Sequence, residues 1–175
     1  PQYRSNILNS KPAIEYDETD DYHNTGIDVD TNQPRSVYFV VKWPDNNNRK
    51  YAFGAQNPSG NKFFVGTNNK EYNLGYGGSF SSGSSITTNS YVIVSVVYGS
   101  GSGEVWENQT SKGTLSYTGQ GSLGVDYRLG AIYNQGSLER YLNSNLLEVL
   151  DYQAEHSDTT RQDVEAYLND KYGVF

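Results

Sequence analysis

The sequence predicts an all-β fold, an antiparallel β-sandwich with one C-terminal amphipathic helix. Its 175 residues include 16 Tyr and 18 Gly. Aromatic residues fit pleated strands, and Gly supplies the positive φ of tight turns. Apolar segments recur at short, regular spacing, separated by turn-forming runs such as PDNNN, NPSGN and SSGSS. Many short strands at this spacing are typical of two antiparallel sheets packed face to face.

We expect strands where β-branched and aromatic residues gather between these turns. In chain order the expected strands are SVYFVVKW (36–43), KYAFGAQ (50–56), KFFVGT (62–67), EYNLGYGG (71–78), SYVIVSVVYG (90–99), GEVWENQT (103–110), KGTLSYT (112–118), VDYRLGAIYN (125–134) and LLEVLDYQ (146–153). The serine-rich run SFSSGSSITTNS (79–90) predicts a long mobile loop.

The end of the chain changes to helical periodicity. Beyond Ser157, apolar residues fall at i, i+3, i+4 and i+8, namely Val164, Tyr167, Leu168 and Tyr172. Ser157 is placed to cap the first turn, and Gly173 stands where a glycine commonly ends a helix. We therefore expect a helix that buries Val164, Leu168 and Tyr172 against a sheet.

The length suits a single domain spanning 1–175. Because the sequence contains no Met, we expect it to be a piece excised from a longer polypeptide. The formal net charge of -7 argues against a nucleic-acid partner, since phosphate backbones are bound by clustered Lys and Arg. No apolar run approaches the roughly 20 residues that span a bilayer, so no membrane insertion is expected.

Nearly the whole chain resembles a known family, most specifically in its last strand and helix. The opening LNSKPAIEYDETDDY (8–22) and the closing segments RYLNSNLLEVLDYQ (140–153) and SDTTRQDVEAYLNDKYG (157–173) are similar to the concanavalin A-like lectin/glucanase superfamily, in its laminin-G-like (LamG-type) branch of bacterial and phage proteins. The resemblance implies a jelly-roll sandwich with two curved sheets and one concave face. It also implies an extracellular, cell-surface or virion-surface location.

The segment AIEYDETDDYHNTG (13–26) concentrates acidic residues and has three interpretations. Glu15, Asp17 and Asp20 partly match the catalytic E-x-D-x-x-E strand of glucanases in this superfamily, in which a retaining carboxyl pair lies about 5 to 5.5 Å apart. Alternatively, hard carboxylate oxygens suit Ca²⁺, and the candidate ligands are Asp17, Asp20 and Asp21.

The third interpretation of this segment is a structural turn. In it, Asp20 or Asp21 accepts hydrogen bonds from nearby backbone N–H groups, while Tyr16 and Tyr22 pack inward. The turn interpretation makes the stretch a signature of the fold and assigns it no chemistry.

Other titratable residues give no catalytic constellation. His23 and His156 are expected at the solvated surface. Glu104 and Glu107 lie three apart, so in a regular strand they face opposite ways and cannot form a carboxylate pair. Both are expected to be solvated edge charges, and we expect no enzymatic activity.

The abundance of Tyr points to carbohydrate. Aromatic rings stack on the C–H faces of sugars while polar side chains bind the hydroxyls. Because a buried phenol must find a hydrogen-bond partner, sixteen Tyr exceed what a core needs, and some are expected on the surface. The residues expected to bind carbohydrate are Trp43, Tyr51, Tyr72, Tyr76, Trp106, Arg128 and Asn134.

The leading hypothesis is a non-catalytic carbohydrate-recognition or adhesion module of a bacterial surface protein, secreted enzyme or phage tail protein. Parent-protein domains or oligomeric partners would surround it. No cofactor is required, although Ca²⁺ is possible. The alternative is a structural virion or cell-surface domain that contacts protein without binding sugar, and a polysaccharide hydrolase or lyase ranks third. Binding of a neutral sugar by this acidic surface is expected to be largely insensitive to salt.

Overall fold

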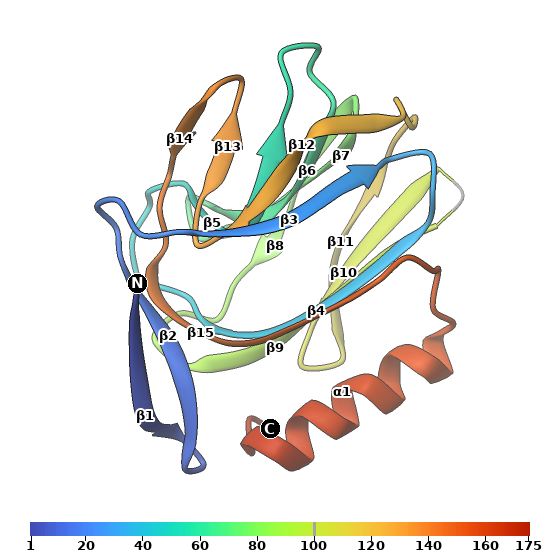
Figure 1. The fold of residues 1–175 in the computed structure, drawn as a ribbon. Helices are drawn as coiled ribbons and strands as arrows, with labels where there is room; N and C mark the ends of the chain where they lie inside the picture. Colours follow the sequence, from blue (N-terminus) through green and yellow to red (C-terminus); the bar gives the residue numbers. More distant parts are fainter. Residues whose placement is uncertain (100) are drawn as a thin grey trace.

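A computed structural model describes residues 1–99 and 101–175, which form two β-sheets with one helix packed outside (Figure 1). The strands are β1 (Gln2–Leu8), β2 (Lys11–Asp17), β3 (His23–Asp30), β4 (Arg35–Lys42), β5 (Lys50–Gln56), β6 (Lys62–Asn68), β7 (Glu71–Gly77), β8 (Ser79–Ser85), β9 (Tyr91–Tyr98), β10 (Ser102–Glu107), β11 (Thr110–Ser116), β12 (Ser122–Leu129), β13 (Ile132–Asn134), β14 (Ser137–Glu139) and β15 (Asn143–Tyr152). The helix is α1 (Asp158–Tyr172).

The two sheets have seven and eight strands. The seven-stranded sheet has the order β1-β2-β15-β4-β9-β10-β11. The eight-stranded sheet contains β14-β13-β5-β6-β7-β8, with β12 pairing with β5 and β3 pairing with β12. Neighbouring strands are antiparallel except β13 and β5, which are parallel. The predicted antiparallel sandwich with a C-terminal helix is therefore confirmed.

Strand β4 shows why the core lies where it does. It occupies the middle of the seven-stranded sheet, and both of its faces are apolar. Val37, Phe39 and Val41 join the core between the sheets, whereas Tyr38 and Val40 join a smaller cluster under α1. Successive residues of a strand face opposite ways. The continuous apolar run of β4 is therefore buried on both faces of the sheet.

Helix α1 lies along the outer face of the seven-stranded sheet, below β4 and β9 in Figure 1. The Ser157 side chain accepts a hydrogen bond from the Thr160 backbone N–H at 3.2 Å, and Gly173 ends the helix with a φ of 64°. Leu168 and Tyr172 are buried, with Val164 packed beside them, which confirms the predicted stripe. Among the described residues, no helix has the length and apolar character that a membrane crossing needs.

The structure differs from the sequence prediction mainly in its polar strands. The run 79–90 was expected to be a loop, but Ser79–Ser85 forms β8 and pairs with β7. Edge strands are held by backbone hydrogen bonds and need little apolar patterning. The same reason explains why the edge strands β1 and β3 were missed, whereas β2 was missed although it pairs with both β1 and β15. The predicted strand 125–134 divides into β12 and β13 at Gly130, whose φ is 78°.

Candidate functional site

The outer face of the eight-stranded sheet carries the candidate site. Directly opposed residues of an antiparallel pair lie on the same face. One cross-strand row consists of Tyr51, Gly66, Asn73 and Ser82, and the next consists of Gly54, Phe64, Gly75 and Phe80. Their chain neighbours Phe63 and Leu74 belong to the core between the sheets, so both rows face away from that core.

Glycines in these rows make room for aromatic rings. A Cβ atom added at Gly66 would lie within 3.0 Å of the Tyr51 ring, and one added at Gly75 would lie within 3.0 Å of the Phe64 ring. Real Cβ atoms essentially never approach other atoms so closely. The glycines therefore allow the Tyr51 ring to lie over β6 and the Phe64 ring to lie over β7.

A cavity of about 210 Å³ opens on this face, and we call it the outer-face cavity. Its lining residues are Arg49, Tyr51, Gln56, Lys62, Phe64, Asn73, Phe80, Asn134, Gln135 and Arg140. Tyr51 and Phe64 pack edge to face with ring centroids 4.9 Å apart and form a small cluster with Ile132. The Phe80 side chain stands at the rim and is 63% exposed. The cavity thus has two buried aromatic rings and one exposed ring.

Two amide side chains of the outer-face cavity have incomplete hydrogen bonding. Asn73 is 2% exposed, and its Oδ1 accepts a hydrogen bond from the Tyr51 hydroxyl at 3.1 Å. Its Nδ2 has no partner among the described residues, nor does Oδ1 of Asn134. A buried polar atom without a partner costs about 1 to 3 kcal/mol. A ligand that supplied the missing partners would recover this cost.

The charged side chains of the outer-face cavity are all basic. They are Arg49, Lys62 and Arg140, and no aspartate or glutamate of the described residues lines the cavity. The Arg140 guanidinium lies 5.9 Å from the centre of the Tyr51 ring. Burial raises the pKa of the Tyr51 phenol, and the nearby charges of Arg140 and Arg49 oppose that shift. Burial also lowers the pKa of Lys62, whose ammonium donates to the Gly60 carbonyl at 2.6 Å.

Three of the predicted sugar-binding aromatic residues are core residues instead. Trp43, Tyr72 and Tyr76 are completely buried between the sheets, so the prediction that they stack on a ligand is wrong. Their polar atoms find partners inside the protein. Trp43 Nε1 donates to the Tyr72 hydroxyl at 3.3 Å, and the Tyr76 hydroxyl donates to the Gln33 carbonyl at 2.7 Å. The expectation that some Tyr lie on the surface is nevertheless confirmed, because Tyr3, Tyr22, Tyr152 and Tyr167 are between 39% and 68% exposed.

The remaining predicted residues are divided among three places. Tyr51 is 1% exposed and cannot serve as an open platform, but it lines the outer-face cavity together with Asn134. Trp106 lies on the opposite sheet, with the Arg161 guanidinium 4.4 Å from its ring centre. It lines a separate cavity of about 320 Å³ beside the start of α1. Arg128 donates to Asn24 Oδ1 at 2.9 Å on β3.

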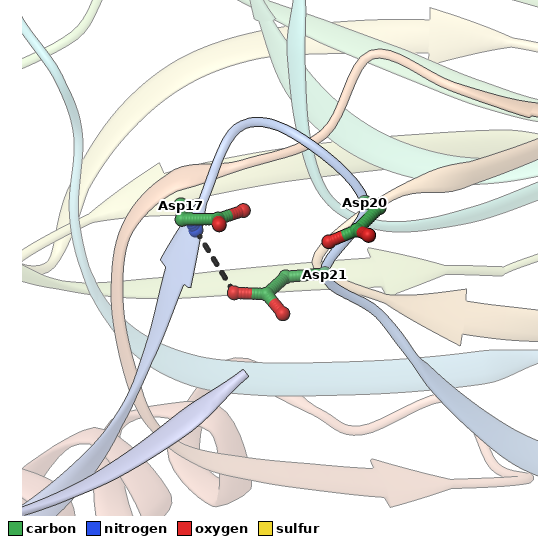
Figure 2. Close-up of side chains that lie close together, drawn as sticks. All are labelled: Asp17, Asp20 and Asp21. Atoms are coloured by element: carbon green, nitrogen blue, oxygen red, sulfur yellow. Dashed lines mark hydrogen bonds between the residues drawn. The ribbon is translucent and has the colours of Figure 1, made fainter.

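The acidic cluster lies where β2 turns into β3, and Figure 2 shows its three aspartates. Asp17, Asp20 and Asp21 each offer a carboxylate oxygen, and these atoms lie within 4.8 Å of one another. Asp17 Oδ1 accepts from the Thr19 backbone N–H at 2.9 Å, and Asp21 Oδ2 accepts from the Asp17 N–H at 3.1 Å. These bonds support the turn interpretation, and calcium binding stays a prediction.

Tyrosines and histidines flank the turn differently from expectation. Tyr16 is buried and its hydroxyl lies 3.0 Å from His23 Nδ1, whereas Tyr22 is 39% exposed, so only Tyr16 packs inward. His23 is exposed, as predicted. His156 is half-buried, and its Nδ1 lies 2.8 Å from the Tyr38 hydroxyl. Burial lowers the pKa of His156. The prediction that His156 is a solvated surface residue is therefore only partly met.

The strand β10 carboxylates face opposite ways, as predicted, but only one is solvated. Glu104 lines the cavity beside Trp106, on the outer side of the sheet. Glu107 is 3% exposed and points into the sandwich, where the Tyr72 hydroxyl donates to it at 2.7 Å. The expectation that Glu107 is a solvated edge charge is wrong, and no pattern in the strand distinguishes it from Glu104.

Comparison with known proteins identifies the fold. No protein-family model matches the chain, and no curated protein does. Among solved structures, the chain is similar to the CBM40 module of the Ruminococcus gnavus IT-sialidase bound to α2,3-sialyllactose, with a TM-score of 0.67 and 11% identity over 94% of this chain and 98% of that one. A heptameric SAP-like pentraxin from Limulus polyphemus gives a TM-score of 0.64 and 13% identity over 87% of this chain and 81% of that one.

The NanB sialidase of Streptococcus pneumoniae, in its K499G mutant, gives a TM-score of 0.66 and 12% identity over 87% of this chain. The chain spans 27% of that enzyme's length. At these identities the likeness shows the fold alone. The chain is a jelly-roll sandwich of the concanavalin A-like class, as the resemblance in its sequence implied.

Proposed function

We propose that this chain is a non-catalytic carbohydrate-recognition module and that the outer-face cavity is its sugar site. The observation that carries this proposal is the combination of aromatic rings with a buried, unpaired amide on one face of the sheet. Apolar C–H faces of a sugar suit the exposed Phe80 ring, while sugar hydroxyls suit the Asn73 and Asn134 amides. Few other ligand classes present both kinds of surface on one small ring.

The comparisons support this proposal through the whole-length match. The CBM40 module, whose structure contains sialyllactose, is covered almost completely by this chain. The sialidase NanB is covered over only 27% of its length. A recognition role without catalysis fits this pattern. Such a module would act at the extracellular, cell or virion surface, beside domains of a parent protein or oligomeric partners.

The cavity size indicates how much of a glycan is held. At about 210 Å³ it is smaller than the roughly 300 to 1,000 Å³ of typical small-molecule sites. It suits one sugar unit, with the remainder of the glycan extending past Phe80. Affinity per site should therefore be weak, and several copies of the module would be needed for strong attachment.

The test is a glycan array followed by titration calorimetry with a glycan that binds. Phe80→Ala should weaken binding about two- to tenfold through loss of one stacking ring. The melting temperature should not change, because Phe80 is exposed. Tyr3→Ala is the matched control, since Tyr3 is 68% exposed on β1 of the other sheet. Equal loss in both variants contradicts the site. If the array shows no binding, the protein-interaction alternative takes its place.

A further inference from the structure

The outer-face cavity has a charge opposite to that of the protein. The whole chain carries 20 Asp and Glu against 13 Lys and Arg. Nevertheless, the charged residues lining this cavity are Arg49, Lys62 and Arg140, with no carboxylate from the described part of the chain. A basic hollow in an acidic protein concentrates positive potential where a ligand would sit. This feature is separate from the aromatic and amide groups that support sugar binding in general.

The two arginines retain hydrogen-bond donors for a ligand. Arg49 forms no ion pair within the described residues. Arg140 Nε lies 3.6 Å from a Glu139 carboxylate oxygen, and both side chains are about one-third exposed. A guanidinium has five N–H donors in a planar fork that matches a carboxylate or a sulfate. No side-chain hydrogen bond from Arg49 or Arg140 is present at normal hydrogen-bond distance within the described residues.

Asn73 adds a donor at the buried end of the outer-face cavity. Its Oδ1 is already occupied by the Tyr51 hydroxyl, so the group left without a partner is the Nδ2 donor. With Asn73 and the two guanidinium groups, the unused polar groups are mostly donors. Such a set fits a ligand that is rich in acceptors, and an anionic oxygen is the strongest acceptor.

We propose that the outer-face cavity selects sugars that carry an anionic group, either a carboxylate or a sulfate. Arg49 and Arg140 bind the anion, and Asn73 donates to an oxygen of the same sugar unit. This inference rests on the proposed sugar-binding function. The composition of the chain led to the expectation that binding is largely insensitive to salt, and this inference reverses it. The ligand faces the local positive charge of the cavity, not the negative net charge of the whole chain.

The experiment measures affinity for matched pairs of acidic and neutral probes by titration calorimetry. The probes are lactose, 3′-sialyllactose and 3′-sulfolactose, together with trigalacturonate and its methyl ester. We expect at least one acidic probe to bind roughly tenfold or more tightly than its neutral partner. We also expect that preference to shrink as NaCl is raised, because salt screens exposed charges. Comparing the sialylated with the sulfated lactose shows which anion is preferred.

Variants connect the preference to the cavity. Arg49→Gln and Arg140→Gln should each reduce the acidic preference roughly tenfold, and Arg49→Lys should restore part of it. Lys11→Gln, at an exposed position of β2 in the other sheet, is the control with the same change of charge. All variants should melt at the wild-type temperature.

The possible failures are distinguishable. If neutral probes bind as well as acidic ones and depend on Phe80 but not on Arg49 or Arg140, the anion inference is wrong and the proposed function stands. An acidic preference that survives both arginine substitutions also overturns the inference. If the probes and the array both show no binding, the proposed function itself is wrong, and the anion inference is overturned with it.

Discussion

Glu107 illustrates how single buried polar groups hold this sandwich together. Its carboxylate accepts hydrogen bonds from the hydroxyls of Tyr72 and Thr87, both at 2.7 Å, and from the Thr87 backbone N–H at 3.1 Å. Burial raises the pKa of Glu107. The hydrogen bonds from Thr87 and Tyr72 and the charge of Lys112 lower it by more than burial raises it, so the net shift of the pKa is downward. The ionised carboxylate therefore ties β7, β10 and the segment after β8 together.

We predict that Glu107→Gln lowers the free energy of unfolding by about 1 to 3 kcal/mol at pH 7. Since the pKa of Glu107 is lower in the folded than in the unfolded protein, its ionisation stabilises the fold above the ordinary value of 4.5. That contribution is lost as pH falls below this value. Urea denaturation between pH 3 and 7 should show the difference between wild type and variant shrinking with acid.

Glu104→Gln is the control for this prediction, because Glu104 lies on the same strand but faces outward. Its effect should stay within about 0.5 kcal/mol at all pH values. A Glu107→Gln effect that is equally large at pH 3 and pH 7 would show that packing, not ionisation, accounts for the loss.

The acidic turn supports a separate prediction about calcium. The carboxylates of Asp17 and Asp21 accept hydrogen bonds from backbone N–H groups, whereas Asp20 makes no side-chain hydrogen bond within the described residues. If the three carboxylates bind Ca²⁺ with the ~10⁻⁴ to 10⁻³ M affinity of extracellular modules, ~10 mM calcium should stabilise the protein by about 1 to 3 kcal/mol. Differential scanning fluorimetry measures this. Asp20→Asn should remove the effect and keep the turn. If calcium leaves the melting temperature of the wild-type protein unchanged, the calcium prediction is wrong and the three aspartates serve only to form the turn.

At the scale of elements, the sequence predicted apolar strands well and polar strands poorly. The predicted strands 36–43 and 90–99 nearly coincide with β4 and β9. Both strands have buried faces, which give the sequence a clear apolar pattern. Strand β8, with the sequence SFSSGSS, has no alternation and is defined only by its backbone bonds to β7. Sequence patterns report side-chain burial, so they give no signal for a strand whose side chains face solvent.

The helix was predicted with both of its caps, and its contribution to stability can be measured. Leu168 is fully buried in the cluster beneath α1. Leu168→Ala should lower the free energy of unfolding by about 2 to 5 kcal/mol, and truncation after Tyr152 should cost at least as much. Chemical denaturation provides the measurement. Tyr167→Ala, at a side chain 50% exposed on the same helix, should cost far less. Equal losses of unfolding free energy in the two variants would contradict the assignment of Leu168 to the buried face of α1 and Tyr167 to its exposed face.

At the scale of the whole molecule, the fold class was predictable and the site was not. The outer-face cavity unites strands β5 to β8 with Gln135 and Arg140, which lie fifty or more residues beyond the end of β8. Only Tyr51 and Asn134 of the predicted residues line it. Buried and exposed tyrosines look alike in sequence, because internal partners such as the Gln33 carbonyl are not visible there. The glycines at 66 and 75, within strands, were the available signal of close approach.

The location of the sugar site is the central claim, and NMR titration tests it most directly. Amide ¹H–¹⁵N spectra would be recorded while the glycan that binds most tightly on the array is added. We predict that the largest shift changes fall on the outer face of β5 to β8, around Tyr51, Phe64, Asn73 and Phe80. Changes concentrated around Trp106 and the start of α1, with the outer face of β5 to β8 unaffected, would contradict the account.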